Sequence, residues 1–329
     1  MLNLFKKSPS VNAYPFIREI KSPITKEQLV PLDEKCRVVQ FSSPLTESDH
    51  AKLSAFMEKY PDISFRVYGH YQKDSLNDLK FLKNYPFVRN FQVDVFEINS
   101  IDGVEYLSEN LEFFGFGQTR KTFSLNFLAR FQKLKDLYIE AHEKDIEVIS
   151  TLTNLDHLSL RSITLKDLSI LIPLKKLWWL AIKLGGTKNL SLISKIENLK
   201  YLELWMIKGL EDISPISELS KLQFLFLQDL KNVKTIPDFS KCQDLKRIVI
   251  ENLKGLSDLS PLLKATSLED LIVVSGNNFK PSDFLCLKNH KSLKTAVIGL
   301  GSLKKNKEVK EMLNLPTTES YSKFDFKFE

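Results

Sequence analysis

The fold is decided by two stretches of sequence, LKYLELW at residues 199–205 and LQFLFLQ at residues 222–228. Each begins with a leucine, and two more leucines follow three and five positions later. The last two leucines are two positions apart, so they lie on the same face of a short β-strand. One such strand cannot bury this face alone, so neighbouring copies must complete the core.

The same apolar-x-x-apolar-x-apolar pattern recurs along most of the chain. Its first positions are Val88, Leu111, Leu134, Leu155, Leu177, Leu199, Leu222, Leu245, Leu268 and Leu293. Successive first positions are 21 to 25 residues apart, which is the period of a leucine-rich repeat. About ten repeats in register predict an α/β solenoid, a leucine-rich-repeat horseshoe with a parallel β-sheet on its concave face. Short helical, 3-10 or irregular segments are expected on its convex face.

The segments that return from one strand to the next carry a second signal. Asp212-Ile213-Ser214-Pro215-Ile216 recurs as Asp258-Leu259-Ser260-Pro261-Leu262. Proline opens a short helical turn at little cost, because the N–H groups of a first turn have no intrahelical partner. Together with the strand pattern, these segments resemble the bacterial leucine-rich-repeat proteins of the internalin kind over residues 88–300.

One position departs from the internalin pattern. Internalin coils usually place an asparagine three residues after the last leucine of the strand. In this chain that position holds Ile163, Ile207, Leu230 and Leu253. An apolar side chain cannot bond to backbone groups, so the bend must satisfy its hydrogen bonds differently.

The two ends of a solenoid expose its core and need caps. Residues 1–87 are predicted to form an N-terminal cap and irregular first coils, residues 88–300 the solenoid and residues 301–329 a C-terminal cap. The first region contains expected strands at 37–41 and 63–67. Between them we expect a helix with Thr46 as N-cap and Asp49 reaching back to it.

The C-terminal cap carries two local patterns. Residues 308–315 predict a short helix. Residues 323–328 alternate phenylalanine with charged residues, which predicts a strand with one wet face that covers the last coil. The alternative is a flexible aromatic motif that docks on a partner.

Composition sets limits on the class of protein. The 329 residues are 43% hydrophobic and 27% charged, which is typical of a folded chain. Basic and acidic residues number 47 and 41, and this mixture argues against a nucleic-acid footprint. Three widely spaced cysteines, Cys36, Cys242 and Cys286, suggest free thiols. Without an apolar leader after Lys6-Lys7 or a spanning segment, we expect a cytoplasmic location and no membrane partner.

The sequence shows little sign of catalysis. Its five histidines form no metal-ligand spacing such as HExxH, and His142-Glu143 is interpreted as a solvated bend. Gly115-Phe116-Gly117 lacks the third glycine and the following helix of a phosphate loop. We therefore predict a non-enzymatic protein with no catalytic residue, no metal site and no cofactor.

Residues that alternate with the strand leucines form columns on the concave face. The middle coils place aromatic side chains there, surrounded by charged ones, on a face expected to meet water. Such composition is typical of an interaction hot spot. The predicted partner-binding residues are Tyr138, Arg161, Trp179, Lys183, Tyr201, Glu203, Trp205, Phe224, Phe226, Arg247 and Glu251.

Two other interpretations of this face stay open. Cross-strand aromatic pairs stabilise sheets without any partner. A cap or the C-terminal tail could also lie across the face. Farther along, Val249, Ile272, Val274 and Val297 either extend the patch or are shielded by the tail.

The favoured function is a monomeric, cytoplasmic, bacterial scaffold that binds another protein on its concave face. By analogy of fold, an immunity or antitoxin-like protein is one version of this hypothesis. The alternatives are an exported effector or adhesin that binds a host protein, and an enzyme whose site is grafted onto the scaffold.

Overall fold

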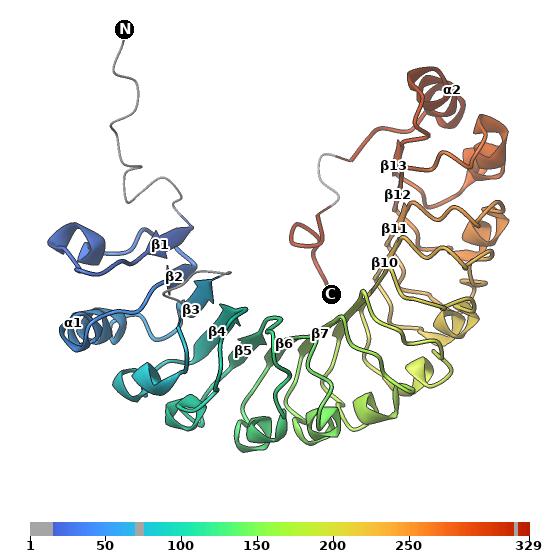
Figure 1. Cartoon of the computed structure of the whole chain (residues 1–329). Helices are drawn as coiled ribbons and strands as arrows, with labels where there is room; N and C mark the ends of the chain where they lie inside the picture. The colour runs from blue at the N-terminus through green and yellow to red at the C-terminus, as the bar shows by residue number, and fades with distance from the viewer. Residues whose placement is uncertain (1–15, 70–75, 319–321) are drawn as a thin grey trace, which may run out of the picture. The chain divides into compact units, whose positions relative to one another are not determined.

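The computed structural model describes residues 16–69, 76–318 and 322–329. The chain forms two compact units, Met1–Val148 and Ile149–Glu329. Both are stacks of coils, each with one short strand and an outer segment of helix or turn (Figure 1). This is the predicted leucine-rich-repeat architecture. The two compact units do not correspond to the predicted N-terminal cap, solenoid and C-terminal cap, and that division stays a prediction.

In the N-terminal unit, neighbouring strands pair in parallel and in chain order. They are β1 (Ile17–Glu19), β2 (Val38–Phe41), β3 (Ser64–Gly69), β4 (Asn90–Val95), β5 (Phe113–Phe116) and β6 (Asp136–Glu140). The helix α1 (Glu47–Met57) lies between β2 and β3 in the sequence, as predicted. The predicted cap also includes residues 1–15 and 70–75, which lie outside the described residues.

In the C-terminal unit, the strands again pair in parallel and in chain order. They are β7 (His157–Arg161), β8 (Trp179–Lys183), β9 (Tyr201–Trp205), β10 (Phe224–Gln228), β11 (Arg247–Glu251), β12 (Asp270–Val274) and β13 (Thr295–Ile298). The ten predicted repeats correspond to β4 through β13.

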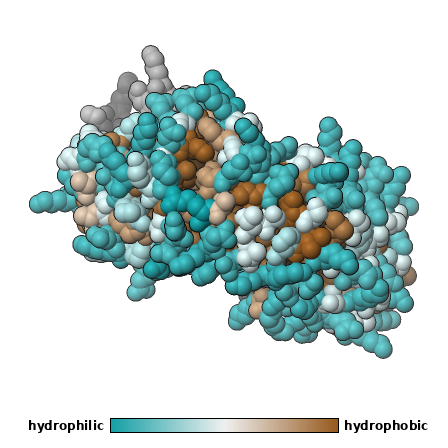
Figure 2. All heavy atoms as spheres, turned by 90° about the horizontal axis from the view of Figure 1, so that it is seen from below, coloured by the Kyte–Doolittle hydropathy of each residue, from teal (hydrophilic) through white to brown (hydrophobic). Residues whose placement is uncertain are grey.

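The outer segments of the coils are mostly 3-10 helices. They are Lys26–Leu29, Lys80–Asn84, Val104–Tyr106, Asn126–Arg130, Ile146–Thr151, Ser169–Leu171, Ile193–Lys195, Ser214–Glu218, Ser260–Lys264 and Pro281–Asn289. The view from below shows mostly hydrophilic residues, with narrow hydrophobic bands between them (Figure 2).

The core follows from the leucine pattern. Leu202 and Leu204 of β9 are fully buried, and they pair in register with Leu225 and Leu227 of β10. Each buried leucine contributes roughly 1.5–3 kcal/mol relative to an exposed one. Ordering costs about 1–2 kcal/mol per residue, so one coil gains too little to fold and the stack is needed.

The missing asparagines are replaced by a buried apolar column. Ile163, Ile207, Leu230 and Leu253 are at most 4% exposed. These side chains cannot bond to the backbone, so other groups satisfy the bend. The backbone does this itself, because the residue that follows each of the strands β7 to β11 donates its N–H to a carbonyl of the next coil. The N–H of Met206 donates to the carbonyl of Gln228 at 2.9 Å.

To make these hydrogen bonds, the non-glycine residues that follow the strands adopt a left-handed backbone conformation. The φ angles are 54° at Ser162, 54° at Leu184, 50° at Met206, 53° at Asp229 and 53° at Asn252. Left-handed geometry costs an L-residue roughly 1–2 kcal/mol, less for asparagine and aspartate. Leucine and methionine have no such relief, so Leu184 and Met206 carry local strain.

We predict that Met206→Gly stabilises the protein. Met206 is 42% exposed, so little packing is lost when its side chain is removed. Relief of the left-handed strain should raise the free energy of unfolding by about 0.5–1 kcal/mol in urea titrations. Met206→Ala keeps a Cβ at φ 50° and serves as the matched control. A glycine variant less stable than the alanine variant would contradict this explanation.

Three local expectations need correction. The carboxylate of Asp49 does not return to the helix N-cap, because it accepts hydrogen bonds from the Ser22 hydroxyl and the Ile24 N–H. The C-terminal helix α2 (Leu303–Leu313) begins earlier than expected, with Ser302 as its N-cap. Residues 323–328 form no strand.

His142 was interpreted as part of a solvated bend, and this was wrong. Its side chain is fully buried, and its ring stacks on Phe116 with centroids 3.9 Å apart. One ring nitrogen, Nδ1, accepts from the Phe123 N–H at 3.2 Å. The other, Nε2, must therefore carry the proton, which it donates to the Gly117 carbonyl at 3.2 Å. A second proton would break the bond to Phe123, and burial already lowers the pKa of His142.

We predict that His142 makes the stability of the protein sensitive to acid. Its folded pKa lies below the ordinary 6.5, so the unfolded chain binds a proton first as the pH falls. The free energy of unfolding should therefore decrease below pH 6.5, by at most about 1.4 kcal/mol per pH unit for this one proton. Comparing His142→Gln with the wild type at pH 7.5 and 5.5 isolates its share. Equal acid losses in the two proteins would refute the assignment.

Candidate partner-binding face

The candidate site is the inner face of strands β7 to β11, formed by the side chains that alternate with the buried leucines. The strand register aligns Trp179, Tyr201, Phe224 and Arg247 in one row, as predicted. Trp179 stacks on Tyr201 with centroids 4.6 Å apart, and Tyr201 meets Phe224 edge to face at 5.2 Å. Stacked strands thus bring together aromatic residues that are more than twenty positions apart in the sequence.

The central rings of this face do not meet water. Tyr201 and Phe224 are fully buried, as is the adjoining Ile272. Phe326 and Phe328, from the C-terminal tail, pack against this cluster. We define the tail as residues 322–329. Figure 1 shows the C-terminus on the inner side of the strands of this unit. The tail was expected to cover the last coil, but its aromatic side chains instead lie over the middle coils.

The aromatic contacts of the tail are specific. Phe326 meets Phe224 edge to face at 5.3 Å. Phe328 lies 5.0 Å from Trp178 and 6.1 Å from Tyr201, measured between ring centroids. Phe324, by contrast, is 86% exposed. Two of the three tail phenylalanines therefore act as anchors.

A lysine of the tail pairs with a carboxylate on the inner face. The Nζ of Lys323 lies 2.7 Å from Glu203, whose side chain is only 7% exposed. The same carboxylate pairs with Lys183 at 3.1 Å and accepts from the Tyr201 hydroxyl at 2.8 Å. Burial opposes ionisation of Glu203, but the charges of Lys323 and Lys183 prevail and hold its pKa below the ordinary value. Lys323 also lies 5.0 Å from the centroid of the Trp179 ring, a cation–π distance.

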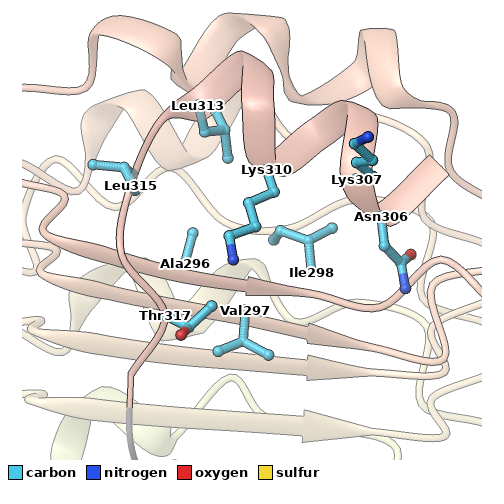
Figure 3. A pocket seen from close by; sticks show the side chains of 9 residues that line it. All are labelled: Ala296, Val297, Ile298, Asn306, Lys307, Lys310, Leu313, Leu315 and Thr317. Atoms are coloured by element: carbon cyan, nitrogen blue, oxygen red, sulfur yellow. The ribbon is translucent and has the colours of Figure 1, made fainter. Parts of the chain in front are cut away.

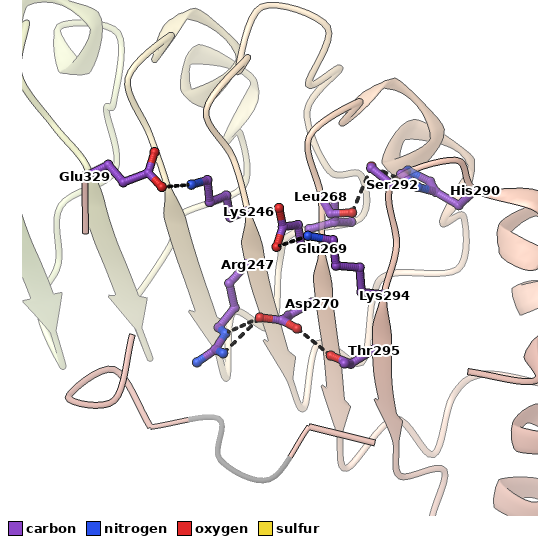
Figure 4. Close-up of polar contacts among 10 residues, drawn as sticks. All are labelled: Lys246, Arg247, Leu268, Glu269, Asp270, His290, Ser292, Lys294, Thr295 and Glu329. Atoms are coloured by element: carbon purple, nitrogen blue, oxygen red, sulfur yellow. Dashed lines mark hydrogen bonds and ion pairs between the residues drawn. The ribbon is translucent and has the colours of Figure 1, made fainter. Parts of the chain in front are cut away.

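The last residue is held at the edge of the face. The side-chain amide of Gln223 donates to the Glu329 carbonyl at 3.0 Å, and its oxygen accepts from the Glu329 N–H at 2.9 Å. Lys200 also donates to that carbonyl, and Lys246 pairs with the Glu329 carboxylate (Figure 4). Lys200, Gln223 and Lys246 were not among the predicted residues, and with Trp178 they form a column immediately before strands β8 to β11. The same repeat spacing indicates this column one position before the predicted one.

Arg247 lies partly beneath the tail. It donates twice to Asp270, at 3.1 Å from Nε and 2.9 Å from Nη2 (Figure 4). Its guanidinium also lies 5.1 Å from the centroid of the Phe326 ring and 5.6 Å from that of Phe224. Its buried Nη1 has no hydrogen-bond partner in the part of the chain that the structure describes. An unmet buried donor is costly, so the tail is an imperfect occupant of this position.

The other predicted residues lie around this centre. The guanidinium of Arg161 lies 5.0 Å from the Trp205 ring centroid, and the Trp205 indole donates to Asp229 at 3.4 Å. Phe226 packs half-buried against the aromatic cluster. Burial raises the pKa of Glu251.

Tyr138, which was also predicted to bind a partner, lies on β6 and belongs to the N-terminal unit. Its hydroxyl donates to Glu140 at 2.6 Å, and both residues line a polar hollow of about 730 Å³. In the same hollow, Asp94 pairs with Arg66 at 2.6 Å and accepts from Gln92 at 2.6 Å. Its carboxylate is thus already bonded by two neighbours.

A second hollow, of about 240 Å³, lies at the C-terminal edge strand. Apolar residues of β13 line it, together with polar and apolar residues of α2 and the side chains of Leu315 and Thr317 (Figure 3). The N–H of Ala296 donates to the Pro316 carbonyl at 3.0 Å. The segment after α2 therefore covers part of an edge that would otherwise offer free backbone donors.

Among the described residues, no three or more histidine, cysteine, aspartate and glutamate side chains form a group that could hold a metal ion. None of the helices there is long and apolar enough to cross a membrane.

No family model and no curated protein matches the chain. Among solved structures, an internalin (inlF) from Listeria monocytogenes aligns with a TM-score of 0.58 and 16% identity, over 91% of this chain and 90% of its own. An internalin C2 (inlC2) from the same species gives 0.46 and 22%, over 68% and 91%. A leucine-rich-repeat protein from Leptospira interrogans gives 0.47 and 16%, over 87% and 90%. The first likeness confirms an internalin-like leucine-rich-repeat fold.

We predict that tryptophan fluorescence reports on the docked tail. The three tryptophans of the chain, Trp178, Trp179 and Trp205, all lie on or beside the inner face. Phe326→Ala/Phe328→Ala should shift their emission to the red and increase quenching by acrylamide, because water reaches the rings. The matched control is Phe324→Ala, which removes an exposed ring. Equal spectra for the double variant and the control would show that the tail does not cover the face.

Proposed function

We propose that this chain is a non-catalytic scaffold that binds another protein on the inner face of its C-terminal unit. The observation that carries the proposal is that the face accommodates an irregular segment, the tail of the same chain. It does so with aromatic side chains, a buried carboxylate and polar groups at its edge.

The chemistry of the face supports this proposal. Tryptophan, tyrosine and arginine are enriched among residues that dominate binding energy, and here they lie on adjacent strands. Lys183, Glu203 and Glu251 lie among and beside them and provide charges that can discriminate between partners. Cross-strand pairing alone also stabilises sheets, but it does not account for the acceptance of a separate segment.

The fold supports the same proposal. Each coil of a leucine-rich repeat contributes a few inward side chains, so adjacent coils form an extended binding surface on a rigid backbone. No folding step has to precede binding on such a surface, which limits the entropy lost when a partner is bound.

We predict that Trp205→Ala weakens partner binding by at least tenfold. Truncation of an aromatic hot-spot residue at an interface typically costs about 2 kcal/mol or more. The immobilised chain should capture the same protein in repeated experiments, and mass spectrometry identifies it. The affinity is then measured by titration of the purified components. Leu285→Ala is the control, because Leu285 is 57% exposed on an outer 3-10 segment.

If the Trp205 variant binds the same protein with wild-type affinity and has an unchanged melting temperature, the binding site lies elsewhere. The origin of the partner separates the two proposed versions of the function. An immunity or antitoxin-like protein should capture its partner from a lysate of the cells that make it. An exported effector or adhesin should capture a host protein.

A further inference from the structure

We infer that the tail occupies the place of a segment from a partner protein. Such a segment carries a basic side chain followed, three and five residues later, by aromatic ones, and it binds only when the tail leaves. The inference rests on the proposed function and deepens it, because it names the chemistry that the partner must present and the contact that it must displace.

The requirement for a basic side chain in the partner segment follows from the environment of Glu203. This carboxylate is 7% exposed, and with Lys323 absent its pairing would fall to Lys183 alone. A buried carboxylate favours a second cation, and the rings of Trp179 and Tyr201 attract one at the same place. The face therefore selects a lysine or arginine at this position.

The aromatic positions follow from the cluster beneath the tail. Tyr201, Phe224, Val249 and Ile272 form an apolar surface that spans four adjacent strands. Phe326 and Phe328 cover it, and without them its rings would meet water. A contiguous apolar surface of this kind is a property of interaction sites and is uncommon on monomers. An incoming segment must therefore bring its own large apolar side chains.

Arg247 indicates that the tail is replaceable. Its buried Nη1 has no hydrogen-bond partner among the described residues, and the Phe326 ring lies against the same guanidinium. A partner segment that brings a carbonyl or carboxylate to this nitrogen gains a hydrogen bond that the tail lacks. The tail compensates through its covalent attachment, which gives it an effective concentration on the order of millimolar.

The experiment uses the full chain and a peptide of residues 322–329 that carries a fluorophore at its N-terminus. The open variant, Lys323→Glu/Phe326→Ala/Phe328→Ala, removes the ion pair and both aromatic anchors of the tail without touching the face, and it leaves the contacts of Glu329 at the edge in place. Fluorescence anisotropy should show that the peptide binds the open variant at least tenfold more tightly than the wild type, because the tethered tail competes. If the triple change lowers the melting temperature, Phe326→Ala alone replaces it, because it removes one aromatic anchor that contacts Phe224.

Two altered peptides test the specificity of the face. The peptide with Phe328→Ala should bind the open variant at least tenfold more weakly than the original. The peptide with Phe324→Ala should bind with the original affinity, since Phe324 is 86% exposed in the tail. Equal loss in both peptides would overturn the inference, as would peptide binding that is equal in the wild type and the open variant or absent from both.

A different segment that could occupy the inner face is the tail of a second copy of this chain. Light scattering of the wild type at increasing concentration should show a monomer. A dimer that disappears in the open variant would overturn the inference in favour of exchanged tails. Failure of the peptide to bind, with partner capture still dependent on Trp205, would reject the inference and leave the proposed function in place.

Discussion

The structure depends on one constraint: successive strands must stack in parallel at a fixed register to bury the two apolar residues that each strand turns toward the core. Leu202 and Leu204 bury their side chains only if β9 lies in register between β8 and β10. Because side chains alternate along a strand, the same register determines which residues face the opposite side. Any shift by one residue would bury Glu203 in the core, so the position of the inner face is a consequence of core packing.

The bend after each strand shows how one substitution in the repeat changes the hydrogen-bonding scheme. Apolar residues such as Leu230 add to the core where the family pattern has an amide. The backbone then carries the hydrogen bonds from coil to coil, and it does so through left-handed residues such as Asp229. Asparagine and aspartate tolerate this conformation, whereas methionine and leucine do not, so the scheme concentrates strain at Met206 and Leu184.

The periodic strands and the capped helix α1 could be predicted from the sequence, whereas contacts between segments without a periodic or capping signal could not. The strand pattern placed Trp179, Tyr201 and Phe224 in one row because their spacing repeats with the coil. The burial of His142 was missed because a histidine after a strand has no periodic signature, and its partners are a ring and backbone groups of the previous coil. The position of the tail over the face was one of two expectations left open, because residues 323–328 have the alternation of a strand that could cover the last coil but pair with none.

The contacts of the tail also account for the composition of the inner face. An aromatic row that met water would attract other chains, and a protein without a cover for it would risk association. The tail supplies the cover from within the chain, and it also brings Lys323 to Glu203, a carboxylate that burial would otherwise disfavour. Binding at this face then becomes an exchange of one aromatic segment for another. The net affinity depends on the difference between the two, which makes the unmet Nη1 of Arg247 the most informative atom of the face.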